Sequence, residues 1–147
     1  MAPKLTATEI LDRFFIAEAV FGSSDAETRE AKLLAMLDTL SPEIRVIQSP
    51  DLPYGGTFKG HDGFRKWSEA MSARFNRLEV TDRRVLVGDA DSEIVVLSTL
   101  KLRVTKTGEE WTKPFAQTIE VDREAGVITL IRPWYWDIGG LNEALAK

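Results

Sequence analysis

The sequence contains no cysteine and only one histidine, His61, among its 147 residues. Without cysteine there is no disulfide framework, no thiolate nucleophile and no cysteine metal site. A single histidine also excludes a histidine-rich metal centre. We therefore expect no metal ion and no other cofactor.

The sequence also lacks long apolar runs and clusters of basic residues. No apolar stretch approaches the roughly 20 residues that span a bilayer, and residues 1–6 lack the apolar core of a signal peptide. The net charge is −4, and basic residues are scattered apart from Arg83 and Arg84, unlike the basic surface of a nucleic-acid-binding protein. These absences predict a cytoplasmic protein that binds neither membrane nor nucleic acid.

What the chain does contain is the composition of one globular domain. Hydrophobic residues make up 44% and charged residues 29% of the sequence, both near the globular average. A chain of this length buries enough surface to form a core without disulfides. No internal repeat or linker interrupts it, so we predict a single domain over residues 1–147.

The first half of the chain predicts three helices. Thr6 and Glu9 form a capping box, followed by helically spaced apolar residues and a stop at Gly22-Ser23: Ile10, Leu11, Phe14, Phe15, Ala17 and Phe21. A second capping box, Ser24 to Glu27, opens a helix that Ser41-Pro42 ends, with the stripe Leu33, Leu34, Leu37 and Leu40. A third helix begins near Gly60, with the stripe Phe64, Trp67, Met71 and Phe75.

From residue 78 the hydrophobic period changes to two, which predicts strands. We expect strands at about residues 78–87, 93–104, 110–122 and 127–135, joined by short turn-rich segments that favour antiparallel hairpins. A short strand at residues 45–48 precedes a Pro- and Gly-rich loop at residues 49–56. Segregated helices and an antiparallel sheet make the fold class α+β.

Gln117 is a neutral polar residue on the apolar face of the strand at residues 110–122. That face carries Trp111, Lys113, Phe115, Gln117, Ile119 and Val121. A buried amide without a hydrogen bond costs about 1–3 kcal/mol. Two interpretations stay open: Gln117 bonds to backbone or a buried water, or it points into a cavity and meets a ligand.

The last strand is apolar on both faces, which indicates that both are covered. One cover would be the helices or a cavity, and the other would be a second subunit. We therefore expect a homodimer through the outer face of the sheet. Arg132 lies on the face with Trp134 and Trp136; it either stacks on Trp134 or pairs with a carboxylate, or it holds a ligand carboxylate or phosphate.

The order of elements, the motif Gly-x-Phe-x-Gly-His-Asp-Gly-Phe before the third helix, and Pro-Trp-Tyr-Trp-Asp near the end resemble a known group. The chain resembles the nuclear transport factor two-like superfamily and, within it, the SnoaL-like domains. The resemblance implies a cone-shaped α+β barrel: a curved antiparallel sheet packed on three N-terminal helices, with a pocket at the wide end. Members include steroid isomerases, polyketide cyclases, dehydratases and binding modules, so the fold does not fix the function.

Catalytic residues of the family are matched only in part. The ketosteroid isomerase tyrosine, base and protonated aspartate fall on Phe14, on Ser49 and near Gln117, and none is present. Asp137 resembles the aspartate of SnoaL-type cyclases, although its partner histidine is missing. Asp137 is therefore either an acid/base, which needs burial to raise its pKa, or the cap of a helix over residues 139–146.

Other candidate pocket residues also have two interpretations each. His61 is either an exposed first-turn residue or a titrating group at the pocket rim, and Tyr54 is either a pocket lip or a surface residue. The aromatic residues Phe14, Phe64, Trp67 and Phe75 favour the core, although such a core also fits a flat ligand.

These observations leave two functional hypotheses and a third, lesser one. The first is a module that binds a small hydrophobic or aromatic ligand, lined by Phe14, Ser49, Tyr54, Trp67, Gln117, Arg132, Trp134 and Trp136. The second is a cofactor-independent isomerase, polyketide cyclase or dehydratase, with Asp137, together with His61, as acid/base and Gln117 as the carbonyl-polarising donor. The third is a dimeric scaffold whose cone is filled by its own side chains.

Overall fold

The computed structural model describes residues 4–18 and 26–147. Its helices are α1 (Ala7–Glu18), α2 (Ala26–Leu37), α3 (Gly60–Arg74) and α4 (Ile138–Ala146). Its strands are β1 (Leu40–Gln48), β2 (Gly56–Lys59), β3 (Phe75–Val87), β4 (Glu93–Val104), β5 (Glu110–Asp122) and β6 (Val127–Tyr135). The predicted α+β class is confirmed.

Helix α1 begins where the capping box predicts. The Thr6 backbone N–H donates to Glu9 Oε1 at 3.0 Å, and the Glu9 N–H donates to Thr6 Oγ1 at 3.1 Å. The predicted buried stripe is also observed, with Ile10, Leu11 and Phe14 almost inaccessible to solvent. The other predicted signals nearby, Phe21, Gly22-Ser23 and the Ser24 cap, lie outside the described residues.

The predicted end of the second helix was wrong. Helix α2 ends at Leu37, and the residues expected to continue and stop it, Leu40 and Ser41-Pro42, belong to strand β1. Leu34, expected in the core, is 51% exposed, while Met36 is buried in its place. The Thr39 N–H and hydroxyl both bond to the Met36 carbonyl and close the helix. Leu40 then pairs with Ile128 of β6, because tertiary pairing overrides local helical spacing.

The third helix ends one residue before the last member of its predicted stripe. Phe75 is the first residue of β3, so this strand begins earlier than expected. The sequence analysis also missed β2, which pairs antiparallel with β1. In this pairing Gln48 lies opposite Gly56, and Arg45 lies opposite Lys59. Both segments are short or transitional, where a period of two is hard to recognise.

The six strands form one sheet in the order β2-β1-β6-β5-β4-β3. The predicted antiparallel hairpins of β3, β4, β5 and β6 are observed. The exception to antiparallel pairing is β1, which lies parallel to β6. Thus the chain's first strand is inserted beside its last, and the sheet stays open between its edges β2 and β3 rather than closing into a barrel.

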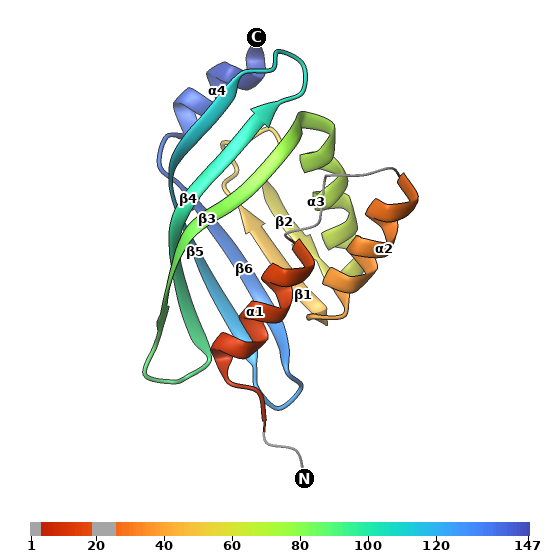
Figure 1. Ribbon diagram of the computed structural model, residues 1–147, viewed down its shortest axis with the longest axis vertical. Helices are drawn as coiled ribbons and strands as arrows, with labels where there is room; N and C mark the ends of the chain where they lie inside the picture. Colours follow the sequence, from red (N-terminus) through yellow and green to blue (C-terminus); the bar gives the residue numbers. More distant parts are fainter. Residues whose placement is uncertain (1–3, 19–25) are drawn as a thin grey trace.

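The sheet curves around the helices, which places the core on its concave side (Figure 1). Helices α1, α2 and α3 lie on that side, and α4 covers one end of the sheet (Figure 1). Two clusters of buried side chains fill the space, one around Phe14 and Phe64 and the other around Tyr54 and Phe115. None of the helices in residues 4–18 and 26–147 has the length and apolar character needed to cross a membrane.

Candidate ligand cavity

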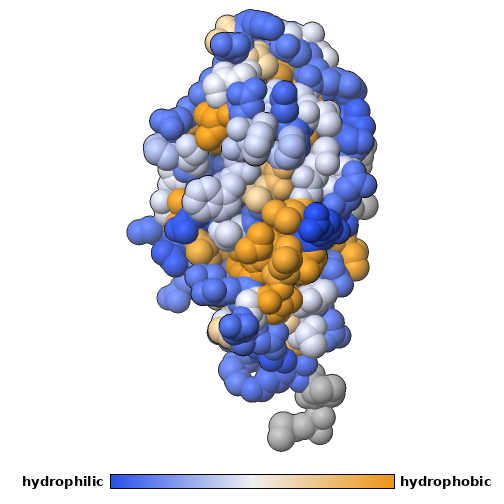
Figure 2. Space-filling model, turned by 90° about the vertical axis from the view of Figure 1, so that its left-hand side faces the viewer, coloured by the Kyte–Doolittle hydropathy of each residue, from blue (hydrophilic) through white to orange (hydrophobic). Residues whose placement is uncertain are grey.

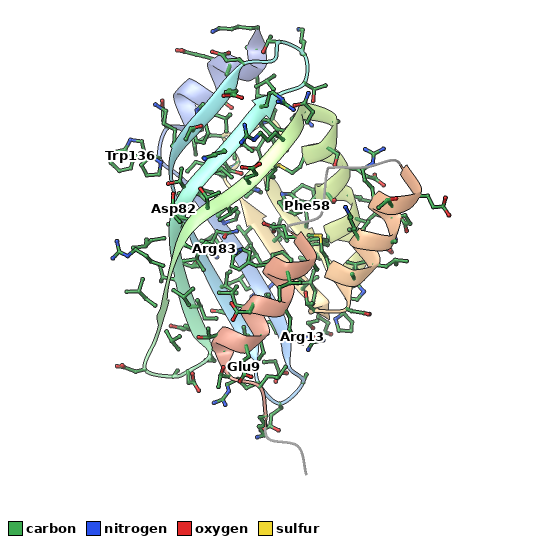
Figure 3. The ribbon with its side chains drawn as sticks, in the orientation of Figure 1. Glu9, Arg13, Phe58, Asp82, Arg83 and Trp136 are labelled. Atoms are coloured by element: carbon green, nitrogen blue, oxygen red, sulfur yellow. The ribbon has the colours of Figure 1, made fainter. Side chains whose placement is uncertain are left out.

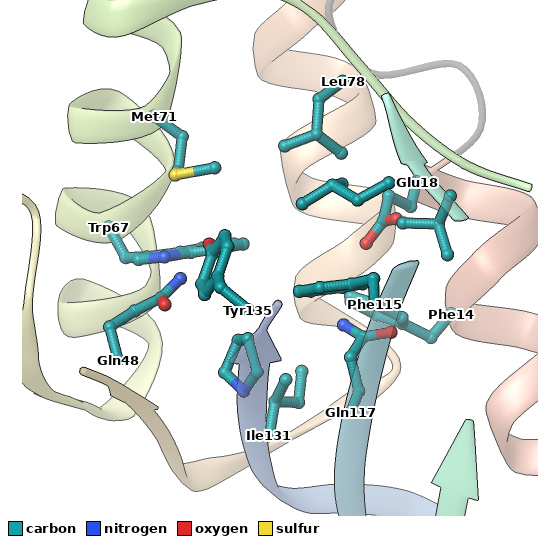
Figure 4. A pocket seen from close by; sticks show the side chains of 13 residues that line it. Phe14, Glu18, Gln48, Trp67, Met71, Leu78, Phe115, Gln117, Ile131 and Tyr135 are labelled. Carbon is teal, nitrogen blue, oxygen red and sulfur yellow. The ribbon is translucent and has the colours of Figure 1, made fainter. Parts of the chain in front are cut away.

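A cavity lies between the concave face of the sheet and helices α1 and α3, where the two core clusters meet (Figure 4). Most of its walls are aromatic or aliphatic. The lining residues are Phe14, Glu18, Gln48, Trp67, Met71, Leu78, Val80, Leu100, Phe115, Gln117, Ile131, Pro133 and Tyr135. An apolar enclosure with a few polar groups is typical of small-molecule sites.

The cavity is narrow. Its free space is about 410 Å³ when the open mouth is counted, but the centre of a water molecule can move in only about 30 Å³ of it. That is room for roughly two waters. A larger ligand therefore requires aromatic side chains of the wall to change rotamer, which is common at binding sites.

Two glutamine amides face this apolar space. Gln117 lies on β5 with 6% exposure, on the buried face that the alternation predicts. Gln48 ends β1 with 1% exposure. The Oε1 atom of Gln117 and both amide atoms of Gln48 make no hydrogen bond with any described residue. Each such atom costs about 1–3 kcal/mol, so both amides favour a polar partner inside the cavity.

The indole of Trp67 adds a third unpaired polar group. Trp67 projects from α3, and its Nε1 is buried without a hydrogen-bond acceptor among the described residues. An indole N–H can only donate. The cavity therefore offers a donor at Trp67 and an amide, which both donates and accepts, at each of Gln48 and Gln117.

Glu18 brings a carboxyl group into the same cavity. It is the last residue of α1, and its carboxyl points toward the space between Phe115 and Leu78 (Figure 4). Burial raises the pKa of Glu18 from 4.5 to about 7, and the positive charge of Arg83 offsets part of that rise. At neutral pH this carboxyl can both release and accept a proton, as an acid/base group must.

Arg83 reaches α1 because strand β3 bulges. Thr81 pairs with Thr99 and Arg84 with Leu97, so Asp82 and Arg83 together face the single residue Ser98. Asp82 has a φ of 54°, a left-handed conformation that aspartate tolerates. The bulge turns Arg83 toward α1 (Figure 3), where its Cζ lies 4.1 Å from the centre of the Phe15 ring.

A pair of tyrosines forms the far wall. The Tyr54 hydroxyl donates to the Tyr135 hydroxyl at 3.2 Å, and the two rings meet edge to face. Burial raises the pKa of both phenols, so both stay protonated at neutral pH. The Gln48 amide lies close enough to the Tyr135 hydroxyl to lower this pKa in part, although their geometry falls short of a hydrogen bond. Since the Tyr135 oxygen already accepts from Tyr54, its own proton is free to donate.

The predicted ligand residues divide between the cavity and the other side of the sheet. Phe14, Trp67 and Gln117 line the cavity, whereas Tyr54 is buried behind Tyr135 rather than forming an exposed lip. Ser49, Arg132 and Trp134 border a separate, wider groove of about 670 Å³ that shares Gln48, Pro133 and Tyr135 with the cavity wall. Trp136 is 75% exposed and points away from the helices (Figure 3).

The structure does not bring Asp137 or His61 to the cavity. Asp137 precedes α4, and its Oδ1 accepts from the Gly140 N–H at 2.9 Å, which confirms the capping interpretation. His61 lies in the first turn of α3, where its Nε2 is 3.1 Å from the Leu40 carbonyl oxygen. Neither residue lines the cavity around Gln117.

Replacing Asp137 with alanine should lower stability by about 0.5–2 kcal/mol, because the first turn of α4 loses its cap. Asp137→Asn keeps a capping oxygen and should remain within a few tenths of a kcal/mol of wild type. Urea denaturation measures both variants. Affinity for a cavity ligand should stay unchanged in both; a loss of ligand binding in the stable Asp137→Asn variant would show that Asp137 acts at the site.

Sequence reasoning missed Glu18, Gln48 and Tyr135 as cavity residues. A signal existed for Glu18, since it follows Phe14 by four residues and Phe15 by three, and so shares the buried face of α1. Gln48 ends an alternating strand on the same face as Val46 and Ile44. The convergence of Gln48 with Gln117 depends on the parallel pairing of β1 with β6, which the sequence did not reveal.

The outer face of the sheet carries an exposed apolar patch (Figure 2). Leu86 of β3 pairs with Val95 of β4. Leu97 of β4 pairs with Ala116 of β5, which in turn pairs with Trp134 of β6. Paired residues point to the same side of a sheet, and Val95 and Leu97 are two residues apart, so all five side chains share that face. Leu86, Val95 and Trp134 are 48%, 37% and 53% exposed. We call these five residues, Leu86, Val95, Leu97, Ala116 and Trp134, the outer patch.

No group of side chains suited to a metal ion occurs among residues 4–18 and 26–147. No protein-family model matches the chain, and no curated protein sequence is similar to it. Solved structures, however, match it over nearly its whole length. The comparison therefore concerns the fold.

Three of these structures show which fold it is. An NTF2-like protein of unknown function from Burkholderia pseudomallei has a TM-score of 0.78 at 17% identity, over 96% of this chain and 98% of that one. A protein described as a SnoaL-like polyketide cyclase, from Jannaschia sp., has a TM-score of 0.72 at 17% identity, over 100% of this chain and 97% of that one. RV0760c from Mycobacterium tuberculosis, in complex with estradiol-17beta-hemisuccinate, has a TM-score of 0.67 at 18% identity, over 91% of this chain and 98% of that one.

The chain therefore has the fold of the NTF2-like and SnoaL-like proteins, as the sequence resemblance implied. At these identities the likeness establishes the architecture and not the activity.

Proposed function

We propose that this protein binds a small, largely apolar organic molecule in the cavity between α1, α3 and the sheet. The observation that carries the proposal is the convergence of unpaired polar atoms of Gln48, Gln117 and Trp67 on a mostly apolar space. A ligand with an oxygen acceptor and an apolar body would satisfy these atoms and replace their missing hydrogen bonds. The same fold holds a steroid derivative in RV0760c, which supports the proposal.

The test is a screen of hydrophobic ketones, phenols and aromatic compounds by two-dimensional NMR, read at the Trp67 indole N–H and at the side-chain amides of Gln48 and Gln117. A ligand of the cavity shifts all three signals together. Shifts confined to Trp134 and Trp136, on the other side of the sheet, would reject the cavity as the binding site.

Replacing Gln117 with leucine should weaken the ligand found by this screen about 2- to 10-fold, because one hydrogen bond is lost. The same variant should be more stable than wild type by about 1–3 kcal/mol, since a buried unpaired amide oxygen is removed. Calorimetric titration and urea denaturation measure the two effects. Thr112→Val, at an exposed position of the same strand, is the control and should change neither.

A second candidate function is a cofactor-independent isomerase, cyclase or dehydratase. Its supporting observation is Glu18, whose pKa of about 7 suits proton transfer and which shares the cavity with Gln117. In this alternative Glu18, rather than Asp137, takes a proton from the carbon next to a carbonyl and returns it to another carbon. The Gln117 amide meanwhile donates to the carbonyl oxygen. Exchange of that carbon-bound hydrogen in deuterated water, lost in Glu18→Gln, distinguishes this enzyme from a binding module.

We also propose that two copies associate through the outer patch. Its contiguous apolar side chains support this arrangement, since exposed apolar surface of this kind marks interfaces. Sedimentation of the wild-type chain at micromolar concentration is the direct measurement. The cytoplasmic location stays a prediction of the sequence.

A further inference from the structure

The cavity carries an unbalanced distribution of charge. Glu18 is its one carboxylic acid, and the described residues that line it include no lysine, arginine or histidine. The other titratable group is the Tyr135 phenol, which stays neutral because burial raises its pKa. The only full charge that this lining can place beside a ligand is therefore negative.

The surroundings of Glu18 make this charge effective. Phe14 precedes it by one turn on α1, and Phe115 of β5 and Leu78 of β3 border it from the sheet (Figure 4). Glu18 keeps part of its surface exposed, but these apolar walls lower the local dielectric, which strengthens an interaction between charges relative to water. From β3, Arg83 acts on Glu18 through its positive charge, but it stacks on Phe15 and does not line the cavity. A ligand inside therefore meets the carboxyl and not the guanidinium.

The opposite side of the cavity complements such a ligand. The rings of Trp67 and Tyr135 border the space on that side (Figure 4). Aromatic faces favour flat apolar groups and cations, and disfavour anions. The Trp67 N–H and the Tyr135 hydroxyl can donate to any ligand oxygen, so discrimination by charge rests on Glu18.

We propose that Glu18 selects the ligand by charge: the cavity admits a flat, apolar molecule with a hydrogen-bond-donating amine or hydroxyl, and rejects its carboxylate analogue. This inference rests on the proposed function, because it names the ligand class of the same cavity. An ammonium or hydroxyl group donates to the Glu18 carboxylate, which restores the hydrogen bonds that this group loses on burial. A ligand carboxylate would instead place two negative charges in one desolvated space.

The proposal predicts opposite pH dependences for amines and carboxylates. An ammonium ligand binds the ionised form of Glu18, so its affinity rises as pH increases through the Glu18 pKa of about 7. A carboxylate ligand binds only the protonated form, so its affinity falls over the same range. A neutral alcohol pairs with either form and should change little.

Three probes with one aromatic body test this selection: 2-(aminomethyl)naphthalene, 2-naphthalenemethanol and 2-naphthoate. Each is titrated at pH 6 and pH 8, and the dissociation constant is read from the Trp67 indole N–H signal. Between these pH values we expect the amine to bind about tenfold more tightly and 2-naphthoate about tenfold more weakly. In Glu18→Gln the affinities of the amine and of 2-naphthoate should no longer change with pH. Glu9→Gln, at the exposed start of the same helix, should retain both pH dependences.

The outcomes separate the two proposals. Binding of 2-naphthoate as tight as that of the amine at pH 8, or opposing slopes that persist in Glu18→Gln, overturns charge selection but leaves ligand binding intact. If none of the three probes moves the Trp67 signal, the binding function itself fails and charge selection fails with it.

Discussion

Glu18→Gln should stabilise the protein by roughly 2–3 kcal/mol above pH 7. Burial raises the pKa of Glu18 from 4.5 to about 7 in the folded chain, so the folded state disfavours the ionised form. Below pH 4.5 the group is protonated in both states and costs nothing. As pH rises from 4.5 to 7, the unfolded chain releases the proton that the folded chain keeps, and stability falls by about 1.4 kcal/mol per pH unit at most.

Glutamine carries no charge at any of these pH values, so the variant should lack this loss. Urea denaturation at pH 5 and pH 8 measures it: the two proteins should be close in stability at pH 5 and well separated at pH 8. Glu9→Gln is the matched control, because a hydrogen bond from the Thr6 N–H lowers the pKa of Glu9. The ionised Glu9 carboxylate therefore stabilises the fold at pH values above its ordinary pKa, whereas the ionised Glu18 carboxylate destabilises it. Equal stabilities of wild type and Glu18→Gln at pH 8 would mean that the Glu18 carboxyl is hydrated.

Replacing Phe64 with alanine should destabilise the fold by about 3–5 kcal/mol. Phe64 is 0% exposed and lies between two cavity residues, with ring centres 6.4 Å from Phe14 and 5.2 Å from Trp67. Removing it loses apolar burial and leaves a void that the helices and the sheet cannot fully close. Chemical denaturation followed by far-ultraviolet circular dichroism measures the loss.

Ile16→Ala serves as the comparison, since Ile16 on α1 is 74% exposed. Its effect should stay below about 0.5 kcal/mol, as for most surface substitutions. A similar loss in both variants would contradict the packing described for α1 and α3. A loss below about 1 kcal/mol in Phe64→Ala would mean that Phe64 is not enclosed.

Local sequence signals predicted many elements correctly because they depend on neighbours in the chain. The Thr6–Glu9 capping box needs only residues three apart, and it forms as predicted. The alternation that placed Gln117 on the buried face of β5 needs only the period of a strand, and Gln117 is buried. Asp137 caps α4 for the same reason, since its bond to the Gly140 N–H joins residues three apart.

Other features depended on partners distant in sequence, and there the predictions were incomplete or wrong. Leu34 and Met36 both fit an apolar helix, and only packing against the rest of the core decides that Met36 is buried and Leu34 exposed. Leu40 fits a helical stripe equally well, until its pairing with Ile128 makes it the first residue of β1. Local spacing carries no information on which of these contacts forms.

The sequence by itself therefore determined the α+β class, the start of α1, the hairpins from β3 to β6 and the inward direction of Gln117. Only the tertiary structure decided which polar groups share a cavity. It places Glu18 and Gln48 with Gln117, and leaves Asp137 and His61 elsewhere. The physical reason is that β1 inserts parallel to β6 and that the sheet curves around α1 and α3. These arrangements bring distant residues together through the burial of whole faces, which no short stretch of the chain specifies.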